Sequence, residues 1–208
     1  MIKSFQHKGL KQFFTKGNKR GIASFNVERV KRILFAIDAA SSPLDLMIPG
    51  FDTHELGGKR KGTWAITLTG NYSDNVRAGR HGHERCEFGG LPLTPKEVVE
   101  RKSVMNKKAR AKPRPTHPGE LLREEVMPAA ELNQVQLAKA LGVSRKTISE
   151  VVLEQRPITV DMAMRLGRYF GNGPNLWLNM QQAVDLWDAI HSHGRTYDRI
   201  KPLKRKAA

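Results

Sequence analysis

Apolar and polar positions follow two different patterns along the first third of the chain. The short segment Leu10–Phe14 is a candidate for a short helix. From Phe25 to Ala40 the apolar residues recur at the spacing typical of a helix that buries one face; they are Val27, Val30, Leu34 and Ile37. Pro49-Gly50 breaks this pattern, and residues 64–69 then alternate large apolar with small or polar side chains, as a half-buried strand does. Two helices followed by a strand predict a small α+β domain.

The pattern changes at Ser73. Residues 73–90 are rich in glycine and poor in large apolar side chains, and neither helical nor strand spacing fits them. The stretch from Lys107 to Pro115 is basic and interrupted by prolines, as linkers often are. We therefore expect an irregular segment over residues 73–112. It would join a domain over 1–72 to a helical domain over 113–195, which a basic tail over 196–208 would follow.

The most specific pattern lies between Leu132 and Ile158. Asn133 is a good N-cap for a helix over residues 134–141, and Ser144 is one for a second helix over 145–153. Gly142 between them can adopt the left-handed backbone of a tight turn. The residues predicted to face inward are Leu137, Ala138, Leu141 and in part Val135 on the first helix, and Ile148, Val151 and Val152 on the second.

This layout predicts a helix-turn-helix, whose second helix enters the major groove with its N-terminal residues at the base edges. An ordinary helical hairpin is the alternative. A hairpin of that kind would not require a small residue at the helix crossing, a glycine in the turn and two adjacent cations at a helix start, which here are Ala138, Gly142, Arg145 and Lys146.

The net charge of the chain also favours a nucleic-acid partner. Of 208 residues, 36 are Lys or Arg and 20 are Asp or Glu, a formal net charge of +16 that the residues before and after Met105 share equally. A basic surface that serves only solubility is the alternative, but such an excess favours a polyanionic partner such as DNA or RNA. The lone cysteine excludes an intrachain disulfide, and no apolar run is long enough to span a membrane. We therefore expect a cytoplasmic protein.

The helix-turn-helix and its flanks resemble the HigA-type antitoxins, a branch of the phage-repressor-like helix-turn-helix family, over about residues 115–190. The matching segments are His117–Leu122, Leu137–Thr147, Ile158, Met162-Ala163, Arg165-Leu166, Trp177–Gln181 and Asp185–Trp187. The resemblance implies a five-helix domain that forms a homodimer, represses its own promoter by binding operator DNA, and neutralises a HigB-type toxin. We expect no cofactor and no metal.

Six positions correspond to the DNA contacts of that family. Gln134 stands where a helix-start glutamine meets a phosphate, and the other five face the groove: Ser144, Arg145, Lys146, Thr147 and Ser149. Arginine or lysine to guanine is the commonest specific contact, but the sequence leaves open which of Arg145 and Lys146 reads a base. Trp177 and Trp187 lie near one helix face and are expected to serve core or dimer packing.

Residues 1–72 resemble the HigB toxins, RelE-like ribonucleases that cut messenger RNA on the ribosome. The matching segments are Leu10–Phe14, Arg29 with the apolar stripe around it, Pro49–Phe51, Gly62–Ile66 and Gly70–Tyr72. The family pattern continues with an arginine, a further strand and a terminal Asp-Tyr-His. Here Ser73 stands at the arginine position and the terminal motif is absent, so the groups that the resemblance makes central to catalysis are missing.

Some groups that suit RNA cleavage remain. Metal-free cleavage needs cations to stabilise charge on the phosphate and groups that transfer protons. His54, Lys59, Arg60 and Lys61 are candidates for those roles, although a solvated basic loop explains them equally well. The enzyme reading, a ribosome-dependent ribonuclease restrained in cis by its fused antitoxin, therefore stands as the alternative to a DNA-binding antitoxin with an impaired toxin domain. A third possibility is a module that binds toxin without binding DNA.

A shift of reading frame would explain the missing end. When residues 73–77 are written as degenerate codons and shifted by one nucleotide, they permit Arg-Ile-Thr-Phe. The same shift across residues 87–94 permits Asp-Tyr-His followed by a stop. Met105 would then be the original antitoxin start. On this hypothesis the metal-like trio of His81, His83 and Cys86 is accidental, and we expect no metal site.

Overall fold

Two helices open the part of the chain that the computed structural model describes, which comprises residues 2, 5, 8–20, 22, 26–57, 64–66 and 112–201. Helix α1 spans Lys8–Lys16 and α2 spans Val27–Ala39. The side chain of Asn26 caps α2 by accepting a hydrogen bond from the Arg29 amide at 3.1 Å, which satisfies one of the free donors of the first turn. Both helices expected from the sequence are confirmed.

A short 3₁₀ turn and a minimal sheet follow these helices. The turn η1 covers Pro43–Leu46, and strands β1, His54–Glu55, and β2, Trp64–Ala65, pair antiparallel with His54 opposite Ala65. The strand expected over residues 64–69 therefore begins where predicted. Its remaining residues, 67–69, lie outside the described part, as does the segment from Ser73 to residue 111 that the frame-shift hypothesis concerns. Of the basic tail expected over 196–208, residues 196–201 are described, and the last helix extends into it as far as Tyr197.

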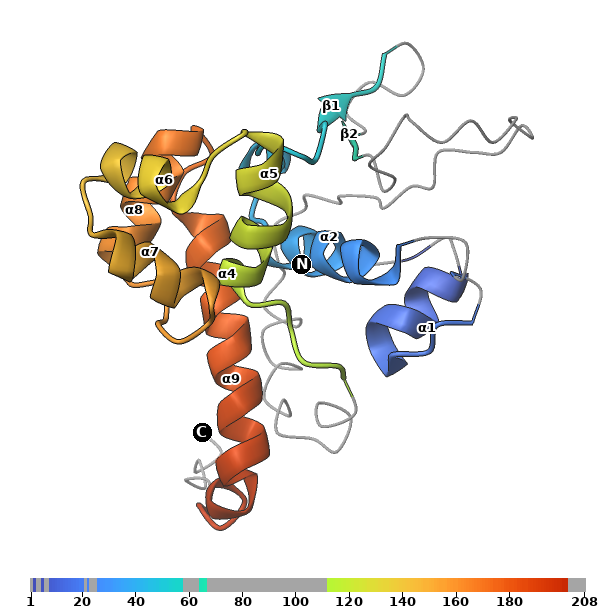
Figure 1. Cartoon of the computed structure of the whole chain (residues 1–208). Helices are drawn as coiled ribbons and strands as arrows, with labels where there is room; N and C mark the ends of the chain where they lie inside the picture. Colours follow the sequence, from blue (N-terminus) through green and yellow to red (C-terminus); the bar gives the residue numbers. More distant parts are fainter. Residues whose placement is uncertain are drawn as a thin grey trace, which may run out of the picture.

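Helices make up the remainder of the described chain (Figure 1). The backbone stays right-handed helical through α4, Pro118–Leu121, the π-type turn η5, Leu122–Val126, and α5, Met127–Ala129, so these three form one rod. It is followed by α6, Gln134–Leu141, α7, Arg145–Val152, α8, Val160–Phe170, and α9, Asn175–Tyr197. Within residues 112–201, the five helical rods that the resemblance implied are thus present. None of the described helices is long and apolar enough to cross a bilayer.

The N-terminal segment packs directly onto the C-terminal helices. Helix α2 lies beside α4 and the upper part of α9 (Figure 1). Residues from both ends of the chain share one buried cluster, which includes Ile33, Ala36, Ile37, Leu46 and Phe51 from the first part and Leu121, Leu122, Val126, Trp177 and Met180 from the second. A smaller cluster joins α1 to the outer face of α2. The two halves that differ in sequence character are therefore joined in a single core.

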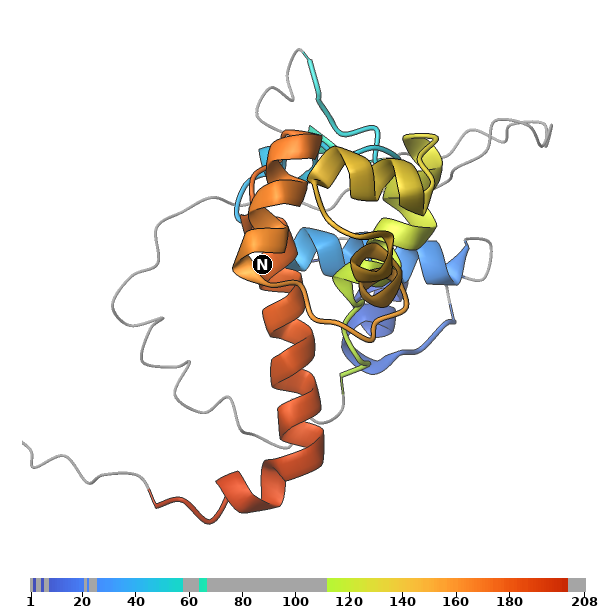
Figure 2. The same cartoon turned by 60° about the vertical axis from the view of Figure 1, so that its left-hand side comes forward.

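Helices α2 and α7 lie on opposite sides of the rod formed by α4, η5 and α5. Figure 1 places α6, α7 and α8 on one side of this rod and α1 and α2 on the other, and Figure 2 brings the first group to the front with α2 behind it. Helix α9 runs from the core outward, so that its C-terminal turns lie away from α6 and α7. The face carrying α7 is consequently not covered by the described N-terminal residues.

Candidate nucleic-acid interface

Helix α6 begins with a reciprocal cap. The Asn133 side chain accepts from the Gln136 amide at 2.9 Å, and the Gln136 side chain accepts from the Asn133 amide at 2.8 Å. This arrangement satisfies two free donors and fixes where the helix starts. Gln134 consequently lies in the first turn, half-buried, where the remaining amides and the helix dipole favour a negatively charged phosphate.

The turn between α6 and α7 has the geometry that the sequence indicated. Gly142 has a φ of 66° and a ψ of 37°, the left-handed region that glycine adopts at little cost. Arg165 of α8 contacts this turn, because its guanidinium donates to the Leu141 carbonyl at 2.7 Å. The same guanidinium is oriented within α8 by a second hydrogen bond, to Asp161 at 2.8 Å. The angle between the two helices is therefore supported by a third helix.

Helix α7 presents its first turn to solvent. The Ser144 hydroxyl accepts from the Thr147 amide at 3.0 Å and lies 2.9 Å from the Thr147 hydroxyl, so the two side chains cap the helix together. Arg145 and Lys146, which follow the cap, are both exposed. Arg145 makes no hydrogen bond or ion pair with any residue that the structure describes, which leaves its five donors free for a ligand.

An open hollow of about 440 Å³ lies along this surface and is lined by Arg145, Lys146, Ser149, Glu150 and Gln155. Glu150 is the acidic member, and it is held by Arg156, whose Nε lies 2.7 Å from its carboxylate, and more loosely by Lys146 at 3.9 Å. The exposed cations Arg145 and Lys146, together with the Glu150 carboxylate, provide both hydrogen-bond donors and an acceptor for base edges.

The position of α7 is set by an unusually close approach to α4. A Cβ on Gly119 would overlap the carbonyl oxygen of Val151, so only glycine lets the two helices meet here. Arg123 of η5 donates to the Val152 carbonyl, one of the free acceptors at the end of α7. Ile148, Val151 and Val152 are buried below the helix, as the sequence predicted. Helix α7 is thus fixed at its C-terminal end and along its inner face.

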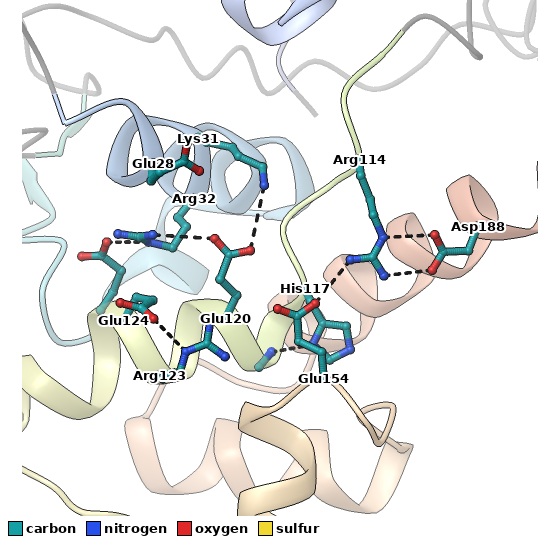
Figure 3. Close-up of polar contacts among 12 residues, drawn as sticks. Glu28, Lys31, Arg32, Arg114, His117, Glu120, Arg123, Glu124, Glu154 and Asp188 are labelled. Atoms are coloured by element: carbon teal, nitrogen blue, oxygen red, sulfur yellow. Dashed lines mark hydrogen bonds and ion pairs between the residues drawn. The ribbon is translucent and has the colours of Figure 1, made fainter. Parts of the chain in front are cut away.

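Two titratable side chains, His117 and Arg114, secure the chain at and just before the start of α4 (Figure 3). Burial lowers the pKa of His117, whose Nδ1 accepts from the Gly119 amide at 3.0 Å and caps α4. Arg114 donates to Asp188 of α9 at 2.9 Å and also contacts Glu154 at 3.3 Å, after the end of α7. The hydrogen bond between Arg114 and Asp188 lowers the pKa of Asp188 and raises the pKa of Arg114.

The structure corrects one expectation about packing and places the two tryptophans. Val135, expected to face inward in part, is 55% exposed, because position 135 lies on the solvent side of α6 while Leu137, Ala138 and Leu141 fill the inner side. Trp177 is fully buried, as expected. Trp187 is half-buried, stacks on His191 and donates to the Lys112 carbonyl at 3.1 Å, so it lies outside the core and its role in dimer packing stays a prediction.

Of the residues proposed for RNA cleavage, the structure places one. His54 lies exposed on β1, with its Nδ1 2.9 Å from the Asp52 carbonyl. Lys59, Arg60 and Lys61 lie outside the described residues, as do His81, His83 and Cys86. The six proposed DNA-contacting positions are described, and they gather on the first turns of α6 and α7 and the surface that follows.

Two family models match this chain, one in each half. Residues 3–75 match the RelE-like toxin HigB of type II toxin–antitoxin systems, and residues 122–177 match a helix-turn-helix model. Antitoxin HigA-1 of Vibrio cholerae is 36% identical over 94 residues, which is 45% of this chain and 89% of that protein. Endoribonuclease HigB of Proteus vulgaris is 43% identical over 72 residues, which is 35% of this chain and 78% of that protein. The chain belongs to both the HigB and the HigA families. We call its described residues up to 66 the HigB segment and residues 112–201 the HigA half.

Other relatives match the chain over shorter or similar spans. Virulence-associated protein I of Dichelobacter nodosus is 57% identical over 70 residues, which is 34% of this chain, and the chain spans 65% of the length of that protein. Among solved structures, the Pseudomonas aeruginosa antitoxin HigA with the higBA promoter is 42% identical, with a TM-score of 0.42, and the match covers 44% of this chain and all of that one.

Sequence reasoning missed several residues that shape the surface of the HigA half. Gln155 and Arg156 were not singled out, because they lie in the irregular stretch after α7 that carries no periodic signal. Gly119 stands within a segment recognised by resemblance, yet nothing in the pattern of apolar residues reveals that α7 passes against it.

Proposed function

We propose that this chain is an antitoxin that represses its own operon, with an impaired HigB segment fused ahead of the DNA-binding half. The observation that carries the proposal is the first turn of α7, where Arg145 and Lys146 stand exposed at the edge of the open hollow and no described residue pairs with Arg145. In the proposed complex α7 enters the major groove. Gln134, Ser144, Arg145, Lys146, Thr147 and Ser149 contact bases and phosphates there.

The arrangement of the two halves supports this function. Because α2 and α7 lie on opposite sides of the rod of α4, η5 and α5, the docked HigB segment leaves the proposed DNA face open (Figures 1 and 2). The promoter and operator DNA bound by HigA relatives adds to the case for DNA as the partner. We further propose a homodimer, so that two copies of α7 would meet half-sites of an inverted repeat about one helical turn apart.

Footprinting tests this proposal on the DNA upstream of the gene itself. We expect protection of an inverted repeat whose half-site centres lie about 10 base pairs apart, with the affinity falling steeply as salt rises because phosphate contacts release counterions. Uniform protection without a boundary, or no protection at low salt, would contradict sequence-specific DNA binding. A fragment of scrambled sequence provides the control.

A further inference from the structure

Carboxylate and amide side chains on α4, η5 and α9, and just before α9, contact the HigB segment. Glu125 of η5 is almost fully buried, with 2% of its side chain exposed, and both of its oxygens are used by α2: Arg32 Nε lies 2.8 Å from Oε1, and Arg29 pairs with Oε2. Glu120 of α4 is also directed at α2, with Arg32 at 3.6 Å and Lys31 at 4.0 Å (Figure 3). Every cation of these pairs belongs to the HigB segment and every carboxylate to the HigA half.

Helix α9 and the residues before it add directed hydrogen bonds. Asn179 donates to the Ala39 carbonyl at 2.7 Å, at the C-terminal end of α2, where carbonyls lack partners within the helix. Asn172 donates to the Asp45 carbonyl of η1 at 3.0 Å and accepts from the Trp177 indole at 3.3 Å. Both asparagines thus recognise the backbone of the HigB segment at its helix ends.

Apolar packing fills the space between these polar contacts. Ile33, Ala36 and Ile37 of α2 are buried in the same cluster as Leu121 and Leu122 of the HigA half. Specific protein–protein interfaces combine buried apolar packing with complementary charges across the contact. The contact between the two halves therefore has the composition of a recognition surface.

We propose that the face formed by α4, η5 and α9 is the docking site for the second helix of a HigB toxin, and that this chain fills the site with its own segment. A separate HigB molecule is consequently excluded while the segment is docked. This inference depends on the proposed function in that it assumes an antitoxin half, but it does not depend on DNA binding.

The tether gives the chain's own segment a large advantage. Linked partners meet at effective concentrations on the order of millimolar, so a free toxin of equal intrinsic affinity at about 1 μM is at a disadvantage of roughly 1000-fold. The chain would therefore bind operator DNA while giving little protection against a separate toxin. Separating or weakening the docked segment should restore toxin binding.

The test measures binding of purified Proteus vulgaris HigB to the full chain before and after the tether is cut. A protease recognition sequence inserted between residues 90 and 91 allows cutting without changing any described contact. We expect the cut chain to bind HigB at least 100-fold more tightly than the intact chain. Equal affinities for the cut and intact chains, or no binding to either, would overturn the proposal.

A charge-reversal pair provides a second route that leaves the HigA half unaltered. Arg29→Glu/Arg32→Glu should release the segment, so that the intact variant binds HigB at least 30-fold more tightly than the wild type does. Lys11→Glu/Lys16→Glu is the matched control, since it reverses two exposed charges on α1 and should leave HigB binding unchanged. Equal HigB affinity in both variants would contradict the proposal.

Operator DNA binding is measured on the same preparations, so that failure of the docking site and failure of the repressor function can be told apart. If HigB binding rises on cutting while no preparation binds operator DNA, the docking site stands and the repressor function fails. If all preparations bind the operator while cutting leaves HigB binding unchanged, the repressor function stands and the docking site fails.

Discussion

The Nε of Arg32 lies 2.8 Å from Oε1 of Glu125, a residue 93 positions further along the chain. This ion pair joins the HigB segment to the HigA half at a site where the Glu125 side chain is 2% exposed. Removing one partner of a buried pair leaves the other charge without compensation in a medium of low polarity. The two residues therefore couple the stability of the two halves.

We expect Glu125→Met to lower the free energy of unfolding by about 3–5 kcal/mol, because Arg29 and Arg32 lose their shared partner. The double variant Arg32→Met/Glu125→Met should cost less than the sum of the single changes by about 1 kcal/mol or more. Urea titrations of the four proteins measure both quantities. Arg114→Met is the control for a more exposed pair and should cost about 1 kcal/mol or less. Strict additivity would contradict the coupling.

The close approach of α4 to α7 gives a second prediction. Gly119→Ala places a Cβ against the Val151 carbonyl, so the helices must separate, and we expect a loss of about 3 kcal/mol or more in the free energy of unfolding. Gly57→Ala is the matched control, since a Cβ there meets nothing within 4 Å, and it should change stability by less than about 0.5 kcal/mol. Thermal unfolding measures the stability of both variants. We expect a clearly lower melting temperature for Gly119→Ala, and similar melting temperatures for the two variants would contradict the described packing.

Burial of His117 predicts a stability loss in acid. Its pKa is lowered in the folded chain, so the unfolded chain takes up the proton first as the pH falls below about 6.5, the ordinary value for histidine. Stability is therefore complete above about pH 6.5 and decreases as the pH falls toward the folded-state pKa. His117→Asn keeps an acceptor for the Gly119 amide but does not titrate, so its stability should fall less between pH 7 and pH 5. Identical pH profiles of the free energy of unfolding would contradict this assignment.

The missing catalytic groups of the HigB segment predict the result of a nuclease assay. Ser73 stands where the resemblance places an arginine, and the terminal Asp-Tyr-His is absent. We expect negligible cleavage of messenger RNA on ribosomes by the purified chain, since stabilising charge on the phosphate depends on positioned cations. Codon-specific cleavage that Lys59→Ala or Arg60→Ala abolishes would instead support the enzyme reading.

Local chemistry made the helix-turn-helix predictable from sequence. Asn133 and Ser144 as caps and Gly142 in the turn each carry their signal within a few residues, and the structure has helices where these signals place them. The same holds for α2, whose apolar stripe has helical spacing. The candidate DNA contacts came from the resemblance to the HigA family, whose contact positions fall on residues at or just after these two caps.

Contacts between distant segments were not predictable. Nothing in the sequence near Arg32 indicates that Glu125 is its partner, because an ion pair between elements has no periodic or local signature. The sequence therefore suggested two separate domains, whereas the structure joins them in one core. Gly119 and Asn179 matter through partners far along the chain, and the same limitation applies to them.

DNA binding by α7 is the central claim, and one titration tests it most directly. Wild type and Arg145→Ala are titrated onto the upstream inverted repeat and onto single-base variants of it, at two salt concentrations. Arg195→Ala is the matched control, because Arg195 is also exposed but lies in the last turns of α9. We expect Arg145→Ala to cost about 1–3 kcal/mol and to lose discrimination at one base pair of each half-site, while Arg195→Ala binds as the wild type does. Unchanged affinity and unchanged base preference in Arg145→Ala would contradict the account.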